Sequence, residues 1–206
     1  MTVACAGAEA VHYVGNEANW RELEDNVKRA ILIVDPTQRV VEDGHVVAWD
    51  VYTSRGRRSQ TVHLQMWRPV RPDHNRYQFV GETVTVALWI GHSRFTLYPR
   101  DRIPVRRGDV IGIYFPKYNP VPWSVAECSH GNEHLYKYNP YGPTMARDSI
   151  ADVVFDRAMT DWNPCRQYSV NVTVMSDQGS LFFHMSIVFA CTSYCRRYRG
   201  GSPTAV

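Results

Sequence analysis

The tripeptide Arg107-Gly108-Asp109 is the shortest stretch of this sequence that could act by itself, because cell-adhesion receptors read an arginine and an aspartate in this arrangement. Such recognition requires both side chains at the tip of an exposed loop. Here the tripeptide follows "IPV" and precedes "VIGIYF", so Gly108 and Asp109 are expected to form a tight hairpin turn between two strands. We favour a turn that needs Gly108 for backbone reasons over an adhesion signal.

An aromatic segment rich in asparagine and proline extends from Tyr114 to Tyr141. Flat apolar rings beside amide groups are the mixture that a carbohydrate site uses to stack a sugar ring and bind its hydroxyl groups. The alternative is that these rings cover an edge of a sheet beneath a long loop. The predicted ligand-binding residues are Tyr118, Asn119, Trp123, Tyr136, Tyr138 and Tyr141.

The segment "CSHGNEH" brings together four potential zinc ligands, Cys128, His130, Glu133 and His134. A structural zinc site usually has a second pair of ligands at a regular spacing, and that second half is missing. We therefore expect a turn here, and we predict neither a bound metal nor a cofactor.

Asn171-Val172-Thr173 is an N-glycosylation sequon. If Val170, Val172 and Val174 face the core, Asn171 and Thr173 must point to the other face, because side chains alternate along a strand. Exposure would allow glycosylation at Asn171, although a strand offers a less accessible backbone than a loop.

The sequence lacks the common motifs of catalysis: it has no Gly-x-Ser-x-Gly, no His-Glu-x-x-His, no phosphate-binding glycine loop and no dinucleotide fingerprint. Paired carboxylates for sugar hydrolysis could still be drawn from six acidic residues. These are Glu82, Asp101, Glu127, Asp148, Asp152 and Asp161. We predict that the chain is not an enzyme.

The composition is that of an ordinary globular domain. The chain has 206 residues, of which 44% are hydrophobic and 21% charged, and its net charge of +3 gives no reason to expect a nucleic-acid partner. Arginine dominates between Arg55 and Arg107, where eleven arginines face three carboxylates. These arginines either solvate turns and strand edges, which we favour, or attract an anionic partner.

Two segments bear on location. The N-terminus lacks the charged start and apolar core of a secretory signal. The apolar run at 181–191 contains His184 and is too short for a hydrocarbon core that needs about 20 residues, so we interpret it as a buried strand, with a truncated membrane anchor as a minor alternative.

Alternating apolar residues predict many short strands separated by turn residues. "TVHLQMW" places Val62, Leu64 and Met66 on one side, and "TVTVALWI" alternates Val84, Val86, Leu88 and Ile90 with threonines, Ala87 and Trp89. Such strands indicate an all-β fold, an antiparallel β-sandwich or jelly roll. One short helix is expected over 16–30, where Trp20, Leu23 and Val27 share a face. The predicted organisation is an N-terminal extension at 1–27, a sandwich domain at 28–190 and a basic tail at 191–206.

Five segments in order carry a family resemblance: "VVEDGHVVAWDVYTSRG", "VHLQMWRPV", "YQFVGETVTV", "FTLYPRDRIPVRRGDVIGIYFPKYNPVPW" and "CRQYSVNVTV". Over about residues 31–174 the chain resembles a recurrent extracellular domain of mosaic secreted and receptor-like proteins in molluscs, amphioxus and other marine invertebrates. The resemblance implies an extracellular β-sandwich used for recognition. It also favours a disulfide between Cys128 and Cys165, whereas Cys191 and Cys195 could pair with each other or with Cys5.

These features predict a secreted or cell-surface domain that recognises a glycan or an extracellular protein without catalysis. The chief alternative is a subunit of an extracellular coat, matrix or particle, with homo- or hetero-oligomers as a possible state. A glycan-cleaving enzyme on a jelly-roll frame is a third alternative.

Overall fold

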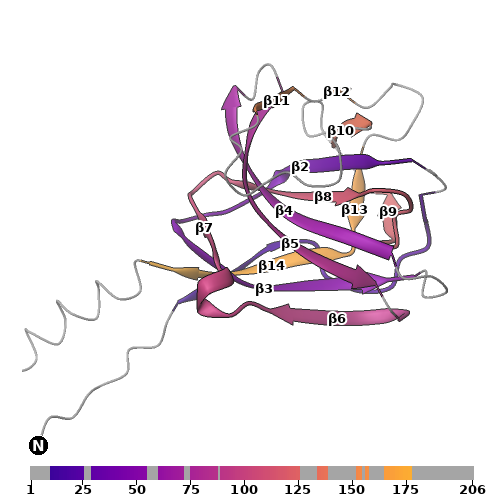
Figure 1. Cartoon of the computed structure of the whole chain (residues 1–206), viewed down its shortest axis with the longest axis horizontal. Helices are drawn as coiled ribbons and strands as arrows, with labels where there is room; N and C mark the ends of the chain where they lie inside the picture. The colour runs from indigo at the N-terminus through magenta and orange to yellow at the C-terminus, as the bar shows by residue number, and fades with distance from the viewer. Residues whose placement is uncertain are drawn as a thin grey trace, which may run out of the picture.

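The chain folds into antiparallel sheets, which confirms the predicted all-β class. The computed structural model describes residues 10–25, 29–54, 60–71, 75–87, 89–125, 134–138, 152–154, 156–157 and 165–177. Within these ranges there is no α-helix, and the helical element is the single 3-10 turn η2 (Pro99–Asp101). Figure 1 shows the strands in two groups, one above the other.

The first sheet has five strands, in the order β1-β14-β3-β6 with β7 also paired to β3. The second has seven, in the order β11-β5-β4-β8-β2-β10-β12, and a small third sheet pairs β9 with β13. The strands of the first sheet are β1 (Val11–Gly15), β3 (Gly44–Thr53), β6 (Gly91–Thr96), β7 (Ile103–Val105) and β14 (Val170–Ser176). Those of the others are β2 (Ile31–Arg39), β4 (Gln60–Arg71), β5 (Arg76–Ala87), β8 (Val110–Phe115), β9 (Trp123–Val125), β10 (Leu135–Tyr138), β11 (Asp152–Val154), β12 (Asp156–Arg157) and β13 (Arg166–Tyr168).

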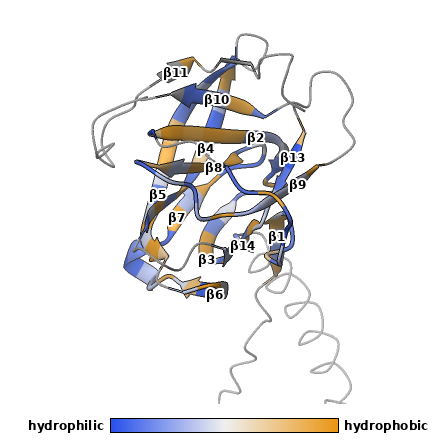
Figure 2. Cartoon of the chain, turned by 90° about the vertical axis from the view of Figure 1, so that its right-hand side faces the viewer, coloured by the Kyte–Doolittle hydropathy of each residue, from blue (hydrophilic) through white to orange (hydrophobic). Residues whose placement is uncertain are grey.

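One apolar core joins the five-stranded and seven-stranded sheets. It contains Trp49 and Val172 of the first sheet together with Leu64, Ile113 and Phe115 of the second. Each large side chain removed from water in this way contributes about 1.5–3 kcal/mol. A second cluster, which includes Leu32 and Trp67, lies on the opposite face of the seven-stranded sheet. β2 is therefore buried on both faces from Ile31 to Val34, and Figure 2 shows most of this strand in the orange of hydrophobic residues.

The alternating pattern predicts the buried face correctly in most strands. Val62, Leu64 and Met66 of β4 are buried, and so are Val170, Val172 and Val174 of β14. In these strands the apolar residues fall at every second position and meet the shared core, as the period of a strand requires.

The second half of β5 is the exception, because its valines lie on the face opposite the shared core. Val84 is 53% and Val86 is 42% exposed, while Thr83 accepts a hydrogen bond from Trp49 Nε1 at 3.1 Å in the interior. The register explains this result: Thr83 pairs with Leu64 of the core face, after an irregularity in the β4–β5 pairing between Met66 and Trp67. An inserted residue reverses the faces of every residue that follows it.

The predicted helix over 16–30 is wrong for the residues described there, which are not helical. Leu23 instead bridges to Trp123, and Trp20 is 68% exposed, so no apolar helix face is buried. Part of the expected N-terminal extension, the described residues 10–25, contacts the strands, while the predicted boundary at residue 27 stays a prediction. β1 pairs with β14 along its whole length and buries Val14 in the shared core.

Candidate functional site

The predicted ligand-binding segment lies largely against the protein itself. Asn119 is only 1% exposed: its Nδ2 donates to Asp25 at 2.8 Å, and its Oδ1 accepts from the backbone N–H of Val121 at 2.8 Å. Its amide is therefore used inside the fold and does not face a ligand. Tyr118 is half-buried, with Lys117 Nζ at 5.5 Å from its ring centre.

Two more of the predicted aromatic residues surround a buried arginine. The guanidinium carbon of Arg166 lies 3.9 Å from the ring centre of Trp123 and 5.9 Å from that of Tyr136. Both rings are partly buried and pack against the main core. Both rings therefore make cation–π contacts with an arginine of the same chain. The side chain of Tyr138 and the whole of Tyr141 lie outside the described residues.

Arg166 belongs to a buried ion-pair cluster that sequence reasoning missed. Its Nη1 donates to Asp25, whose side chain is 3% exposed, and the hydroxyl of Tyr168 donates to the same carboxylate at 2.9 Å. Burial and the charge of Asp25 raise the pKa of Tyr168 well above its usual value, so its hydroxyl stays protonated. Arg166 stands among the polar residues Asn163, Gln167 and Ser169, so the local sequence carries no signal that could have indicated this cluster.

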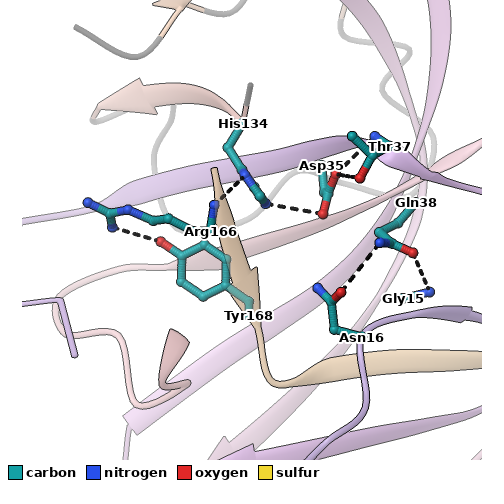
Figure 3. A network of polar contacts seen from close by, with 8 residues as sticks. All are labelled: Gly15, Asn16, Asp35, Thr37, Gln38, His134, Arg166 and Tyr168. Atoms are coloured by element: carbon teal, nitrogen blue, oxygen red, sulfur yellow. Dashed lines mark hydrogen bonds and ion pairs between the residues drawn. The ribbon is translucent and has the colours of Figure 1, made fainter. Parts of the chain in front are cut away.

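A second buried pair continues the polar network, as Figure 3 shows. His134 Nε2 lies 3.1 Å from Asp35 Oδ2, and Thr37 donates to Asp35 Oδ1 through its backbone N–H and its hydroxyl. Burial raises the pKa of Asp35, but the charge of His134, its hydrogen bond and the two bonds from Thr37 outweigh burial and hold the pKa below its usual value.

The cavity beside this network is small. It is lined by Asn16, Asp35, Gln38, His134 and Tyr168, among others, and offers only about 10 Å³ to the centre of a water molecule. That space suits one water molecule and is too small for a sugar or a cofactor. The network therefore joins β1, β2, β10 and β13 as a structural element.

Replacing Asp35 by asparagine is expected to destabilise the fold by about 1–3 kcal/mol at neutral pH, because Thr37 and His134 lose a charged acceptor. The pKa of Asp35 is lower in the folded chain than in the unfolded chain. The charged carboxylate therefore stabilises the fold fully above the unfolded pKa of about 3.9, and this stabilisation is lost as the pH falls through the pKa of the folded chain. The difference between wild type and Asp35→Asn should therefore shrink below about pH 4 in urea unfolding experiments.

Asp101→Asn is the matched control for this pH series, because Asp101 lies on the surface in a 3.8 Å pair with the exposed Arg100. It should leave the stability unchanged at neutral pH. A difference between wild type and Asp35→Asn that stays constant through the acid range would contradict the lowered pKa.

The Arg107-Gly108-Asp109 tripeptide is a turn, as the sequence predicts, but it does not close a hairpin, because β7 pairs with β3 and β8 pairs with β2 and β4. Gly108 has a φ of +93°, and Asp109 is 1% exposed. Asp109 accepts from Arg68 Nε at 2.9 Å, from Arg68 Nη2 at 2.8 Å and from the backbone N–H of Arg106 at 2.8 Å. Its carboxylate is closed in by these donors, so it cannot reach the metal ion of an adhesion receptor.

Most cysteine predictions fall outside the part of the chain that the structure describes. Cys165 is buried and disulfide-bonded. Cys128, Cys191 and Cys195 lie outside the described ranges, so the predicted pairing of Cys128 with Cys165 stays a prediction. His134, from the candidate zinc segment, points to Asp35 instead. Among the described residues, no group of three histidine, cysteine or acidic side chains could hold a metal ion.

The sequon lies in the middle of a sheet. β14 is flanked by β1 and β3, and Asn171 pairs with Gly15 on one side and with Asp50 on the other. Asn171 is half-buried and Thr173 is buried, although both point away from the core as predicted. Glycosylation of the folded chain at Asn171 would require this central strand to leave the sheet.

The outward side of the five-stranded sheet offers a better arrangement for binding a ligand than the aromatic segment does. Asp50 Oδ1 lies 3.0 Å from His92 Nε2, and Arg94 donates to Asp50 Oδ2 and, at 3.2 Å, to the hydroxyl of Thr173. Tyr13 lies directly opposite Thr173 on β1 and is 66% exposed. We call this surface the outer face, formed by Tyr13, Asp50, His92, Arg94, Asn171 and Thr173.

Comparison with protein-family models, with curated proteins and with solved structures finds no significant match to the chain. No helix within the described ranges is long and apolar enough to cross a membrane. Function therefore has to be inferred from the chain's own residues, and the outer face is the surface where an exposed ring adjoins fixed polar groups.

Proposed function

We propose that this chain is a secreted or cell-surface recognition domain that binds a glycan or a glycoprotein without catalysis, on a β-sandwich frame of the jelly-roll type. The disulfide at Cys165 supports an oxidising compartment, where such bonds persist. The resemblance to extracellular domains of marine invertebrates points the same way. The proposed binding surface is the outer face, and the aromatic segment that the sequence favoured is not part of it.

The observation that carries this proposal is the exposed ring of Tyr13 beside a rigid polar network. A tyrosine exposed to 66% on a strand can stack against a sugar ring. The carboxylate of Asp50 is held by His92 and Arg94, so its position is fixed before a ligand arrives. Preformed donors and acceptors of this kind bind hydroxyl groups at a low cost in side-chain entropy.

The outer face also has hydrogen-bond donors that point to solvent. The side chains of His92 and Arg94 are 53% and 45% exposed, so their remaining N–H groups face solvent. Asn171 lies on the same face, but its Oδ1 is buried and has no hydrogen-bond partner among the described residues, so this oxygen is not offered to a ligand. A ligand that spans β1 to β6 would meet a ring at one end and a guanidinium at the other, and the guanidinium suits a ligand with anionic groups.

Replacing Tyr13 by alanine should weaken glycan binding about tenfold or more, which corresponds to about 1.4 kcal/mol. Arg94→Ala should weaken it to a similar extent, because Arg94 is itself a ligand donor and also orients Asp50. The measurement is a glycan array that identifies a ligand, followed by titration calorimetry of wild type and variants with that ligand.

Tyr98→Ala is the matched control, because Tyr98 is 71% exposed and lies beside an arginine, Arg100, at 6.0 Å, but outside the outer face. Its affinity should equal that of wild type. Loss of binding in Tyr118→Ala with full binding in Tyr13→Ala would move the site back to the aromatic segment and refute the outer face. Turnover of a polysaccharide would refute a non-catalytic role.

An assembly role is the second candidate function. The observation that favours it is a group of exposed apolar residues in the second half of β5 and just after its end, where Trp89 is 70% and Ile90 65% exposed. Isolated exposed apolar residues are common, but several within a few residues of one strand indicate an interaction surface.

A further inference from the structure

The second half of β5 is a sheet edge in the part of the chain that the structure describes. On one side β5 pairs with β4 from Arg76 to Ala87. On the other side β11 reaches only Arg76 to Gln78. Alternate backbone N–H and C=O groups beyond Gln78 therefore point outward from the seven-stranded sheet, and such groups are a template for pairing with another strand.

The same half of β5 exposes apolar side chains. Val84 pairs with His63 and Val86 pairs with Thr61, so both valines lie on the face opposite the shared core. The turn into β6 then presents Trp89 and Ile90, and it is held in place by the Thr53 hydroxyl, which donates to the carbonyl of Trp89 at 2.5 Å. We define the β5 edge patch as Val84, Val86, Trp89 and Ile90.

This edge lacks the charges that usually prevent strands from pairing. Residues 83–90 read "TVTVALWI" and contain no charged residue and no proline, although 21% of the whole chain is charged. The neighbouring edge strand β6 carries His92 and Arg94, and both are well exposed. Exposed edges of soluble proteins usually carry lysine, arginine or proline. β6 follows this rule, and β5 does not.

We propose that two copies of this chain form a dimer by pairing their β5 edges antiparallel across a two-fold axis. Closed two-fold dimers are the commonest soluble oligomers, and antiparallel pairing of identical strands is compatible with that symmetry. A register centred on Thr85 puts Val84 opposite the partner's Val86 on one face. Two seven-stranded sheets then become one continuous sheet with a shared apolar patch.

Electrostatics select a second copy as the occupant. In this register the paired stretch 83–87 is neutral, so identical chains approach without placing like charges opposite each other. Glu82 lies outside this paired stretch, and its carboxylate is already bound to His63 at 2.9 Å and to Gln65 at 3.0 Å. A partner that recognises charged side chains would find none in this stretch.

The experiment is a mass measurement of the full chain by light scattering over about 1–100 μM, the range in which interfaces of modest size dissociate. Wild type should change from the 23.7 kDa monomer to twice that mass as concentration rises. Val84→Lys and Trp89→Ser should each weaken dimerisation at least tenfold. A lysine at Val84 places two like charges near the axis, and Trp89→Ser removes apolar area.

The chain offers matched controls for both variants. Val41→Lys changes a valine that is 59% exposed, against 53% for Val84, and Trp20→Ser changes a tryptophan that is 68% exposed, against 70% for Trp89. Both controls should dimerise like wild type. A wild type that stays monomeric throughout, a mass that grows without stopping at the dimer, or equal losses in variants and controls would overturn the proposal. If Val84→Lys fails to fold, Trp89→Ser alone decides.

Discussion

Asp25→Ala is expected to lower the free energy of unfolding by about 3–5 kcal/mol, the largest effect that we predict for a single substitution. The carboxylate of Asp25 receives hydrogen bonds from Arg166, from the Tyr168 hydroxyl at 2.9 Å and from Asn119 at 2.8 Å. Alanine at this position would remove the buried carboxylate that pairs with the guanidinium of Arg166, a side chain only 5% exposed. Removing one partner of a buried ion pair is far costlier than losing a surface contact.

The effect of Asp25→Ala should reach beyond the ion pair, because the carboxylate joins three parts of the chain. Asp25 comes from the segment before β2, Asn119 from the segment after β8, and Arg166 from β13. Urea unfolding followed by tryptophan fluorescence measures the loss, and Trp123 should report the change locally because Arg166 packs over its ring.

Two further variants test the cause of this effect. Asp101→Ala removes an exposed aspartate whose arginine partner lies 3.8 Å away, and it should change stability by less than about 0.5 kcal/mol. Asp25→Asn keeps an acceptor but removes the charge, so its loss should lie between those of wild type and Asp25→Ala. An Asp25→Ala protein as stable as wild type would show that the Arg166 cluster does not hold the fold together.

Asp109→Ala should destabilise the fold by about 2–4 kcal/mol, the second largest expected effect. Asp109 is buried and forms a two-pronged ion pair with Arg68, and it also caps the backbone N–H of Arg106. Arg68 is 28% exposed, so water can solvate part of its charge after the substitution. We therefore expect a smaller loss than for Asp25, again measured by urea unfolding.

Arg107→Ala is the control within the same tripeptide. Arg107 is exposed, and its backbone N–H, which the substitution retains, donates to Asp43 at 2.8 Å. Its removal should change stability by less than about 0.5 kcal/mol. If instead Arg107→Ala and Asp109→Ala both left stability unchanged and both abolished cell adhesion, the turn would have to be reinterpreted as a receptor signal.

The prediction of the fold from sequence succeeded where a residue's role depends on its neighbours along the chain. Alternation identified the residues of β4, β8 and β14 that face the shared core, because a strand repeats every two residues whatever it packs against. The position of Gly108 between two apolar runs identified the turn, since a tight turn between strands favours a residue that tolerates positive φ. Both properties are local.

The prediction failed where partners come from distant parts of the chain. The pattern over 16–30 is typical of a helix, but Leu23 pairs its backbone with Trp123, and this pairing replaces hydrogen bonds within a helix. The rings of Trp123 and Tyr136 look like a sugar site in sequence, yet Arg166 lies against both. Nothing near either ring in the sequence predicts this arginine.

The sequence by itself determined that this protein is built of antiparallel strands, which of their residues are buried in most cases, and that Arg107-Gly108-Asp109 is a turn. Tertiary structure alone decided which polar and aromatic residues remain available to a ligand. In the folded chain, Asn119 is buried and bonded to Asp25, Tyr13 is exposed on the outer face, and Val84 and Val86 of β5 point away from the shared core. The physical reason is that burial and ion pairing depend on strand register and sheet packing, which join residues more than a hundred positions apart.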